Sequence, residues 1–186
     1  MKPFALTAIV AVLFHTPAWS AEAPPLDSIK AVAGGYAKQL KSGLLEQMSK
    51  NGPEGGIVAC SATAAQLGAE TSAQTGWSIK RVSSKARNPL AMPDAYEQEV
   101  LTGFEKALAS GKEDASRYEV VREGGVRYAR FMKAIQIEPV CLTCHGGNEV
   151  PSNVVQKLSE KYPHDIARGY KVGDLRGALS VKVKLD

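Results

Sequence analysis

The most distinctive chemistry in this 186-residue chain lies in the pentapeptide CLTCH at 141–145. The thiols of Cys141 and Cys144 stand three positions apart, so each can form a thioether bond with one vinyl group of a single porphyrin. The imidazole of His145 follows directly and is then placed to bind the iron as the proximal ligand. Pro139, just ahead of the motif, suits a tight turn of the backbone against a flat macrocycle. The spacing therefore predicts one covalently bound haem c.

Two other chemistries use a Cys-x-x-Cys pair. A thioredoxin-like redox pair lies between a strand and a helix of a βαβ unit, whereas the residues after 146 begin a loop. A zinc site needs four ligands, so Cys60 or His164 would have to join the motif. A histidine directly after the second cysteine of an exported chain favours haem over both alternatives.

Haem iron can accept a second ligand on its opposite face. The candidates outside the motif are Cys60, His164, Met48, Met92 and Met132. Cys60 shares a helix face with Ile57, Ala64 and Leu67, which predicts a small side chain pointing into the interior. His164 lies in a polar segment typical of the surface, and methionines usually fill cores. The residue patterns leave the second ligand open.

A basic stretch at 77–89 contains Arg81 and Arg87. The two propionates of a haem are anionic at neutral pH, and a guanidinium can bind a carboxylate through two parallel hydrogen bonds. Both arginines are therefore candidate propionate contacts. A solvated basic loop explains the same residues equally well.

The N-terminus is typical of a secretory signal peptide at 1–20. Lys2 supplies the positive charge, residues 5–14 are almost continuously apolar, and small residues at Ala18 and Ser20 suit a peptidase site. The apolar run is short for a bilayer span, although an uncleaved anchor is the alternative. No later run is long enough to cross a membrane. We expect a periplasmic protein, in which three cysteines cannot all pair internally.

Charge and composition exclude several function classes. The formal net charge is only +4, and a nucleic-acid partner usually requires a strongly basic, clustered face, so we expect none. No Ser-His-Asp set, phosphate-cradling glycine loop or pair of catalytic carboxylates stands out. We therefore expect a protein that is not an enzyme.

Hydrophobic periodicity predicts how these residues are positioned. Helices are expected at 26–48, from 54 or 55 to 73, at 94–109 and at 154–161, with a break at 51–52. Strands are expected at 77–83, 118–121, 126–137 and 177–183, the middle two joined as a hairpin through 123–125. Helices followed by such strands favour an α+β fold with a mostly antiparallel sheet. We expect one domain at 21–186.

Several separated segments give the chain a wider resemblance. They are the sequences IVACS at 57–61, GW at 76–77, KRVS at 80–83, RNP at 87–89, Pro93 with Tyr96 and Glu97, CLTCHG at 141–146 and GDLRGA at 173–178. In this order they resemble the c-type haem domains with a PAS-like fold that occur alone or joined to bacterial sensor kinases. The segment Leu90-Ala91-Met92 departs from the pattern, because the family often has a second asparagine there.

The resemblance implies a PAS-like antiparallel sheet flanked by helices, with a long N-terminal helix. It also implies that Cys60 matches the cysteine that can serve as second axial ligand. We expect a stand-alone redox or diatomic-gas sensor with an unidentified redox or signalling partner. Periplasmic electron transfer is the alternative, and a haem enzyme such as a peroxidase is a third. The amphipathic first helix could pair with a second copy as a homodimer.

Overall fold

The computed structural model describes residues 22–186 of the chain. The predicted signal peptide at 1–20 therefore lies outside the described residues, and the expected domain limits at 21–186 stay a prediction. Within 22–186, no helix has the length and apolar character needed to cross a bilayer.

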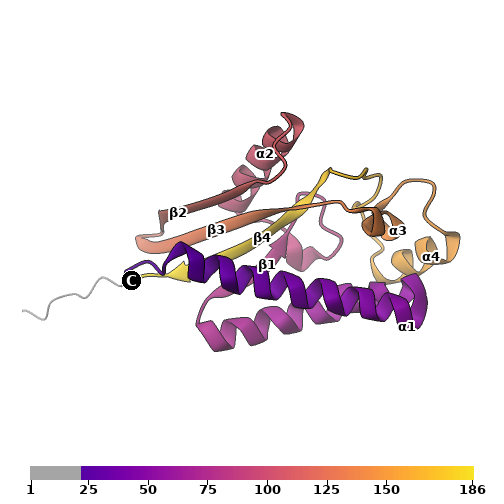
Figure 1. Ribbon diagram of the computed structural model, residues 1–186, viewed down its shortest axis with the longest axis horizontal. Coiled ribbons are helices and arrows are strands. Elements are labelled where there is room, and N and C mark those ends of the chain that lie inside the picture. Colours follow the sequence, from indigo (N-terminus) through magenta and orange to yellow (C-terminus); the bar gives the residue numbers. More distant parts are fainter. Residues whose placement is uncertain (1–21) are drawn as a thin grey trace, which may run out of the picture.

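The first element, α1 (Leu26–Thr75), is a helical hairpin. Gly52 breaks the helix with φ 66° and ψ −171°, a backbone conformation that favours glycine, and Pro53 opens the second arm. The arms lie side by side (Figure 1), and the Tyr36 hydroxyl on one donates to the Ala64 carbonyl on the other at 3.1 Å. The two helices predicted on either side of 51–52 are thus confirmed.

Four strands form one antiparallel sheet in the order β1-β4-β3-β2. They are β1 (Ser78–Val82), β2 (Ser116–Glu123), β3 (Val126–Gln136) and β4 (Leu175–Lys184). Gly124 and Gly125 join β2 to β3 with φ 57° and 85°, as a tight hairpin turn requires. The predicted α+β fold with an antiparallel sheet is confirmed, although β2 is longer than the expected 118–121.

Helices cover both faces of the sheet (Figure 1). The first arm of α1 packs its apolar side on one face, and α2 (Ala95–Ala109) packs on the other. The α1 side of the core includes Ile29, Ala33, Tyr36, Ile79, Phe131, Leu179 and Val181. The α2 side includes Val82, Val100, Leu101, Phe104, Met132 and Ala178. Because side chains alternate along a strand, β1, β3 and β4 each contribute to both cores.

A buried ion network lies on the α2 side of the sheet. Glu97 and Arg130, each with a side chain only 1% exposed, lie 3.5 Å apart. Glu97 also accepts a hydrogen bond from the Ser180 hydroxyl at 2.6 Å and pairs with Lys80 at 2.9 Å. Asp94 pairs with Arg130 at 2.8 Å and caps α2. The charges thus have partners, which burial requires.

Gly177 lets β1 and β4 approach closely at one end of the sheet. Its φ is 156°, and a Cβ there would overlap the Val82 carbonyl. The Ser83 hydroxyl also donates to the Arg176 carbonyl at 2.7 Å. The start of β4, which carries Arg176, is therefore fixed against the end of β1.

Short helical segments surround that end of the sheet. They are η1 (Pro89–Ala91), η2 (Pro139–Cys141), α3 (Leu142–His145) and α4 (Ser152–Lys161). Val154 and Leu158 of α4 pack against Ile57 in the second arm of α1. The CLTCH segment therefore follows β3 directly and lies near the tip of the α1 hairpin (Figure 1).

Candidate functional site

A cavity of about 320 Å³ lies between the α1 hairpin, the sheet and the segment with the CLTCH motif. Each of the six site residues named from the sequence lines it: Cys60, Arg81, Arg87, Cys141, Cys144 and His145. They come from α1, β1, the loop after β1, η2 and α3. All three cysteines are free thiols. The fold thus collects residues that are up to 85 positions apart in the sequence into one cavity.

The imidazole of His145 is held from behind by a backbone carbonyl. Its Nδ1 lies 2.8 Å from the Ala167 carbonyl oxygen, which can only accept, so Nδ1 carries the proton. Nε2 then keeps its lone pair. Burial, with the Arg176 and Arg87 charges, lowers the pKa of His145 to about 3. A neutral ring with its second nitrogen held in this way is the usual arrangement of a metal-binding histidine.

The two motif cysteines are half-buried on consecutive short helical segments. The Cys141 sulfur accepts a hydrogen bond from the Glu138 amide at 3.4 Å. Burial raises the pKa of the Cys144 thiol. Burial therefore favours the protonated form of the Cys144 thiol, and both cysteines line one cavity.

Cys60 lies on the second arm of α1 and lines the same cavity, half-buried. Met48, near the end of the first arm, also lines it. Met132 instead lies in the core between the sheet and α2. Met92 and His164 are exposed and are not among the lining residues. Of the candidate second ligands, Cys60 and Met48 thus share a cavity with His145.

Three arginines each contact a residue that carries a candidate haem ligand or attachment site. Arg81 donates to the Cys60 carbonyl at 3.2 Å, and Arg87 donates to the Cys144 carbonyl at 2.6 Å. Arg176 Nε lies 3.4 Å from Nε2 of His145. The arginines therefore tie the sheet and the adjoining loop to both walls of the cavity.

Arg87 is the one of the three that pairs with a carboxylate among the described residues. Besides the Cys144 carbonyl it binds the Ala167 carbonyl at 3.2 Å and pairs with the Asp165 carboxylate at 3.1 Å. Burial alone would raise the pKa of Asp165, but hydrogen bonds from Arg87 and the Ala167 amide outweigh it and hold that pKa below the usual value. Arg87 thus fixes the loop whose Ala167 carbonyl orients His145.

Arg176 is a site residue that we did not identify in the sequence. Its side chain donates to the Ser83 hydroxyl at 2.8 Å, and within residues 22–186 it forms no ion pair with a carboxylate. Burial lowers the pKa of this guanidinium. The GDLRGA segment at 173–178 pointed to this region, but nothing in it indicates which surface its arginine faces.

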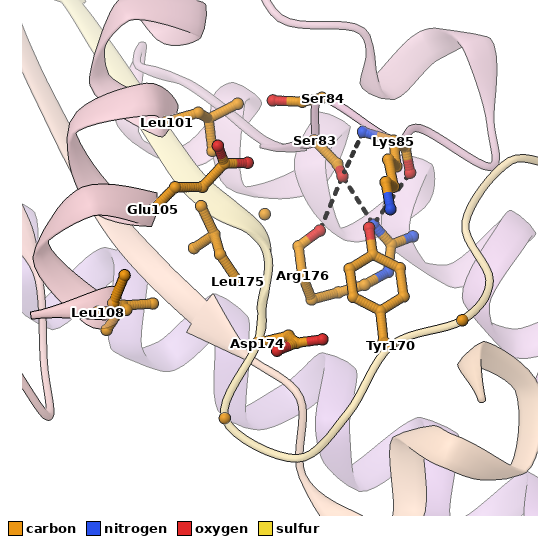
Figure 2. A pocket seen from close by; sticks show the side chains of 14 residues that line it. Ser83, Ser84, Lys85, Leu101, Glu105, Leu108, Tyr170, Asp174, Leu175 and Arg176 are labelled. Carbon is orange, nitrogen blue, oxygen red and sulfur yellow. Dashed lines mark hydrogen bonds between the residues drawn. The ribbon is translucent and has the colours of Figure 1, made fainter. Parts of the chain in front are cut away.

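A second cleft of about 350 Å³ lies on the other side of Arg176 (Figure 2). Figure 2 shows Lys85, Tyr170 and Ser83 beside Arg176, with Leu101 of α2 across the cleft. The Lys85 ammonium lies 5.2 Å from the centre of the Tyr170 ring, and the Arg176 guanidinium 5.7 Å from it. Arg176 therefore forms part of the wall between the two cavities.

The structure also bears on the alternatives for the Cys-x-x-Cys pair. All pairings in the four-stranded sheet are antiparallel, so the motif does not follow the parallel strand of a βαβ unit. Residues 22–186 contain no group of three or more His, Cys, Asp or Glu side chains arranged to hold a metal ion.

Comparisons with known proteins agree with this arrangement. A family model described as Tll0287-like matches residues 23–184. The crystal structure of the cyanobacterial haem protein Tll0287 is similar to this chain with a TM-score of 0.61 and 27% sequence identity. The similarity covers 88% of this chain and 98% of that one. A search of curated proteins finds no significant match.

Proposed function

The chain belongs to the Tll0287-like family, and from that premise we propose that it is an exported redox-sensing protein carrying one haem c on Cys141 and Cys144. The observation that carries the proposal is the cavity at the CLTCH motif, which both thiols line together with His145 and Cys60. A c-type cytochrome needs this combination of two attachment thiols and an imidazole. Export to the periplasm follows from the N-terminal signal pattern.

The residues present fit a haem by their chemistry. The cavity has an apolar lining suited to a flat hydrocarbon ring, which includes Leu40, Leu44, Ile57, Ile135, Leu158 and Leu179. It also has cationic groups with spare donors, because the Nε atoms of Arg81 and Arg87 are buried without a hydrogen-bond partner in the described residues. Such orphaned donors are rare and suit an anionic group. A bound haem supplies a one-electron iron couple at this position.

Attachment requires only the two thiols of the motif. Each cysteine S–H adds across one vinyl C=C bond, with sulfur joining one carbon and hydrogen the other. No group leaves and no net oxidation occurs. Because the two thiols lie on consecutive short helical segments, both additions would take place on one side of the cavity.

Iron ligation uses residues from two separate walls. His145 offers Nε2, and the Ala167 carbonyl fixes the ring that carries it. We assign Cys60, on the α1 hairpin, as the second ligand. A thiolate favours ferric over ferrous iron, so reduction weakens this bond. Loss of Cys60 from the iron would release the second arm of the α1 hairpin from the haem, and this change is the basis of the proposed sensing role.

Periplasmic electron transfer is the second candidate function. It is favoured by the number of contacts that hold the proximal side, since Arg87 binds the Cys144 carbonyl, the Ala167 carbonyl and Asp165 together. A rigid site reorganises little on reduction. The two functions differ in one observable, because a carrier keeps both axial ligands in the ferrous state and the sensor loses Cys60.

The proposal is tested with protein purified from cells able to mature c-type cytochromes. We expect a red protein whose pigment resists extraction with acidified organic solvent, and a Cys141→Ser/Cys144→Ser variant that releases it. Colourless wild-type protein, or pigment lost to the solvent, would refute the haem c proposal. For the second ligand, Cys60→Ala should shift the ferric Soret band and raise the reduction potential, with Met48→Leu as the matched control. An unchanged Cys60→Ala spectrum would dismiss the thiolate.

A further inference from the structure

We propose that Arg176 and Arg81 hold the two haem carboxylates, one each, whereas Arg87 acts only by positioning the proximal side. This inference rests on the proposed haem function and adds a residue, Arg176, to the site. It also divides the two sequence candidates Arg81 and Arg87 into different roles.

The first argument is the balance of charge around the cavity. Four cationic side chains line it: Lys41, Arg81, Arg87 and Arg176. Lys41 pairs with Glu138 at 2.7 Å, and Arg87 pairs with Asp165 at 3.1 Å. Arg81 and Arg176 have no such carboxylate within residues 22–186. Since a cation removed from water needs an opposite charge, two anionic groups are missing from this cavity, which equals the number that a haem brings.

The second argument concerns what Arg176 contacts now. Its Nε lies 3.4 Å from Nε2 of His145, the nitrogen left with a free lone pair. Metal binding at Nε2 would remove this acceptor and require the guanidinium to move. The same event delivers two carboxylates into the cavity. Arg176 thus loses a neutral partner at the moment when a charged partner arrives.

The third argument is that the backbone of Arg176 is fixed, whereas its guanidinium hydrogen-bonds to uncharged groups, the Ser83 hydroxyl, the Lys85 carbonyl and Nε2 of His145. Gly177 and the Ser83 hydroxyl hold its backbone against β1, and Ser83 also accepts from its guanidinium at 2.8 Å (Figure 2). The side chain borders both the cavity and the cleft of Figure 2, so it can turn without disturbing the core. An anchored arginine with spare donors suits bidentate recognition of a carboxylate.

Arg87 contrasts with these two residues. Its guanidinium already holds one carboxylate and two carbonyls, and its side chain is 11% exposed. All three contacts use Nη2, and Nε is buried without a hydrogen-bond partner among the described residues. Moving it onto a propionate would strip Asp165, which is 3% exposed, of its main counter-charge. Arg87 is therefore a positioning residue for Cys144 and for the loop that orients His145.

The test uses the chain with Cys141→Ala and Cys144→Ala, so that porphyrin binding is reversible. The probes are protohaem and its dimethyl ester, which has the same ring and iron but no free carboxylates. We expect Arg176→Gln and Arg81→Gln each to weaken protohaem binding by about tenfold to a hundredfold. Neither should alter binding of the ester by more than a small factor. Arg176→Lys should restore part of the protohaem affinity.

Two controls separate the roles. Arg87→Gln should weaken both probes alike, because its effect passes through the position of His145, and Lys41→Gln should alter neither probe. If Arg176→Gln affects both probes equally, or neither, the assignment is overturned. If neither probe binds even the parent chain, the proposed haem function itself fails. In protein that carries covalently bound haem, Arg176→Gln should also lower the haem reduction potential, because a positive charge near the iron favours the ferrous state. An unchanged reduction potential would count against the assignment.

Discussion

Replacing Arg87 with methionine tests how much of the site depends on one side chain. The substitution keeps an apolar stem of similar length but removes the ion pair with Asp165 and the donors to the Cys144 and Ala167 carbonyls. Arg87 and Asp165 are 11% and 3% exposed, so solvent screens the pair little.

The expected fall in the free energy of unfolding depends on the partners that Asp165 keeps. Removing one member of a buried pair costs about 3–5 kcal/mol. Asp165 would still accept from the Ala167 amide at 2.9 Å and from Arg168 at 3.1 Å. These contacts place the expected loss at the low end, about 3 kcal/mol. In a domain of this size that corresponds to a fall of about 6–12 °C in Tm.

The measurement is urea unfolding of the haem-free chain, followed by circular dichroism. Arg117→Met provides the matched control, because that arginine pairs with Glu99 and Glu119 near the surface and its own side chain is 41% exposed. Its loss should stay below about 1 kcal/mol. Adding Asp165→Asn to Arg87→Met should recover part of the stability, since it removes the unpaired charge. If Arg87→Met lowers the free energy of unfolding no more than Arg117→Met does, the argument that Arg87 holds the proximal side is refuted.

Three further outcomes are expected for the haem-free chain. The pKa of Asp165 is held below its ordinary value of 3.8, so its stabilising contribution is complete above that pH and declines as the pH falls through the folded-state pKa. The free energy of unfolding of Asp165→Asn should therefore fall less steeply between pH 7 and 3 than that of the parent chain. Parallel curves for the two proteins would contradict this. Gly177→Ala should destabilise the chain, because the new Cβ meets the Val82 carbonyl at a backbone angle that suits glycine; an unchanged Tm would show that β1 can shift. Glu97→Ala should lower the free energy of unfolding by about 3 kcal/mol, the low end for a buried pair, because Arg130 keeps Asp94 and Glu123 as partners. A fall below about 1 kcal/mol in chemical denaturation would mean that Glu97 is dispensable.

Helix and strand positions were largely predictable because their sequence patterns are local. The helix expected at 94–109 begins with the capping pair Asp94 and Glu97, and both reciprocal hydrogen bonds are present. Strand β2 was predicted too short, because both of its ends carry exposed polar residues on either face and the alternation of apolar residues fails there. Periodicity cannot detect a strand whose pairing depends on a neighbour.

The candidate site was predictable only in part. The motif residues and Cys60 could be named from spacing and resemblance, and the cavity brings them together. Arg176 could not be identified, since its position depends on the register that pairs β1 with β4 and on the close contact at Gly177. Likewise, the division of labour between Arg81 and Arg87 depends on Asp165, a residue far along the chain that no local pattern connects to them.

The distances along the chain between the residues around the cavity have a consequence for biogenesis. In the proposed function, the two attachment thiols and the iron-binding imidazole lie within five consecutive residues, so a maturation enzyme could attach haem to the unfolded polypeptide. Cys60 lies 81 positions before Cys141, and closing so long a loop has an entropic cost that only tertiary packing can offset. Under the proposed function, haem attachment could therefore precede folding, whereas binding of Cys60 to the iron would require the folded chain.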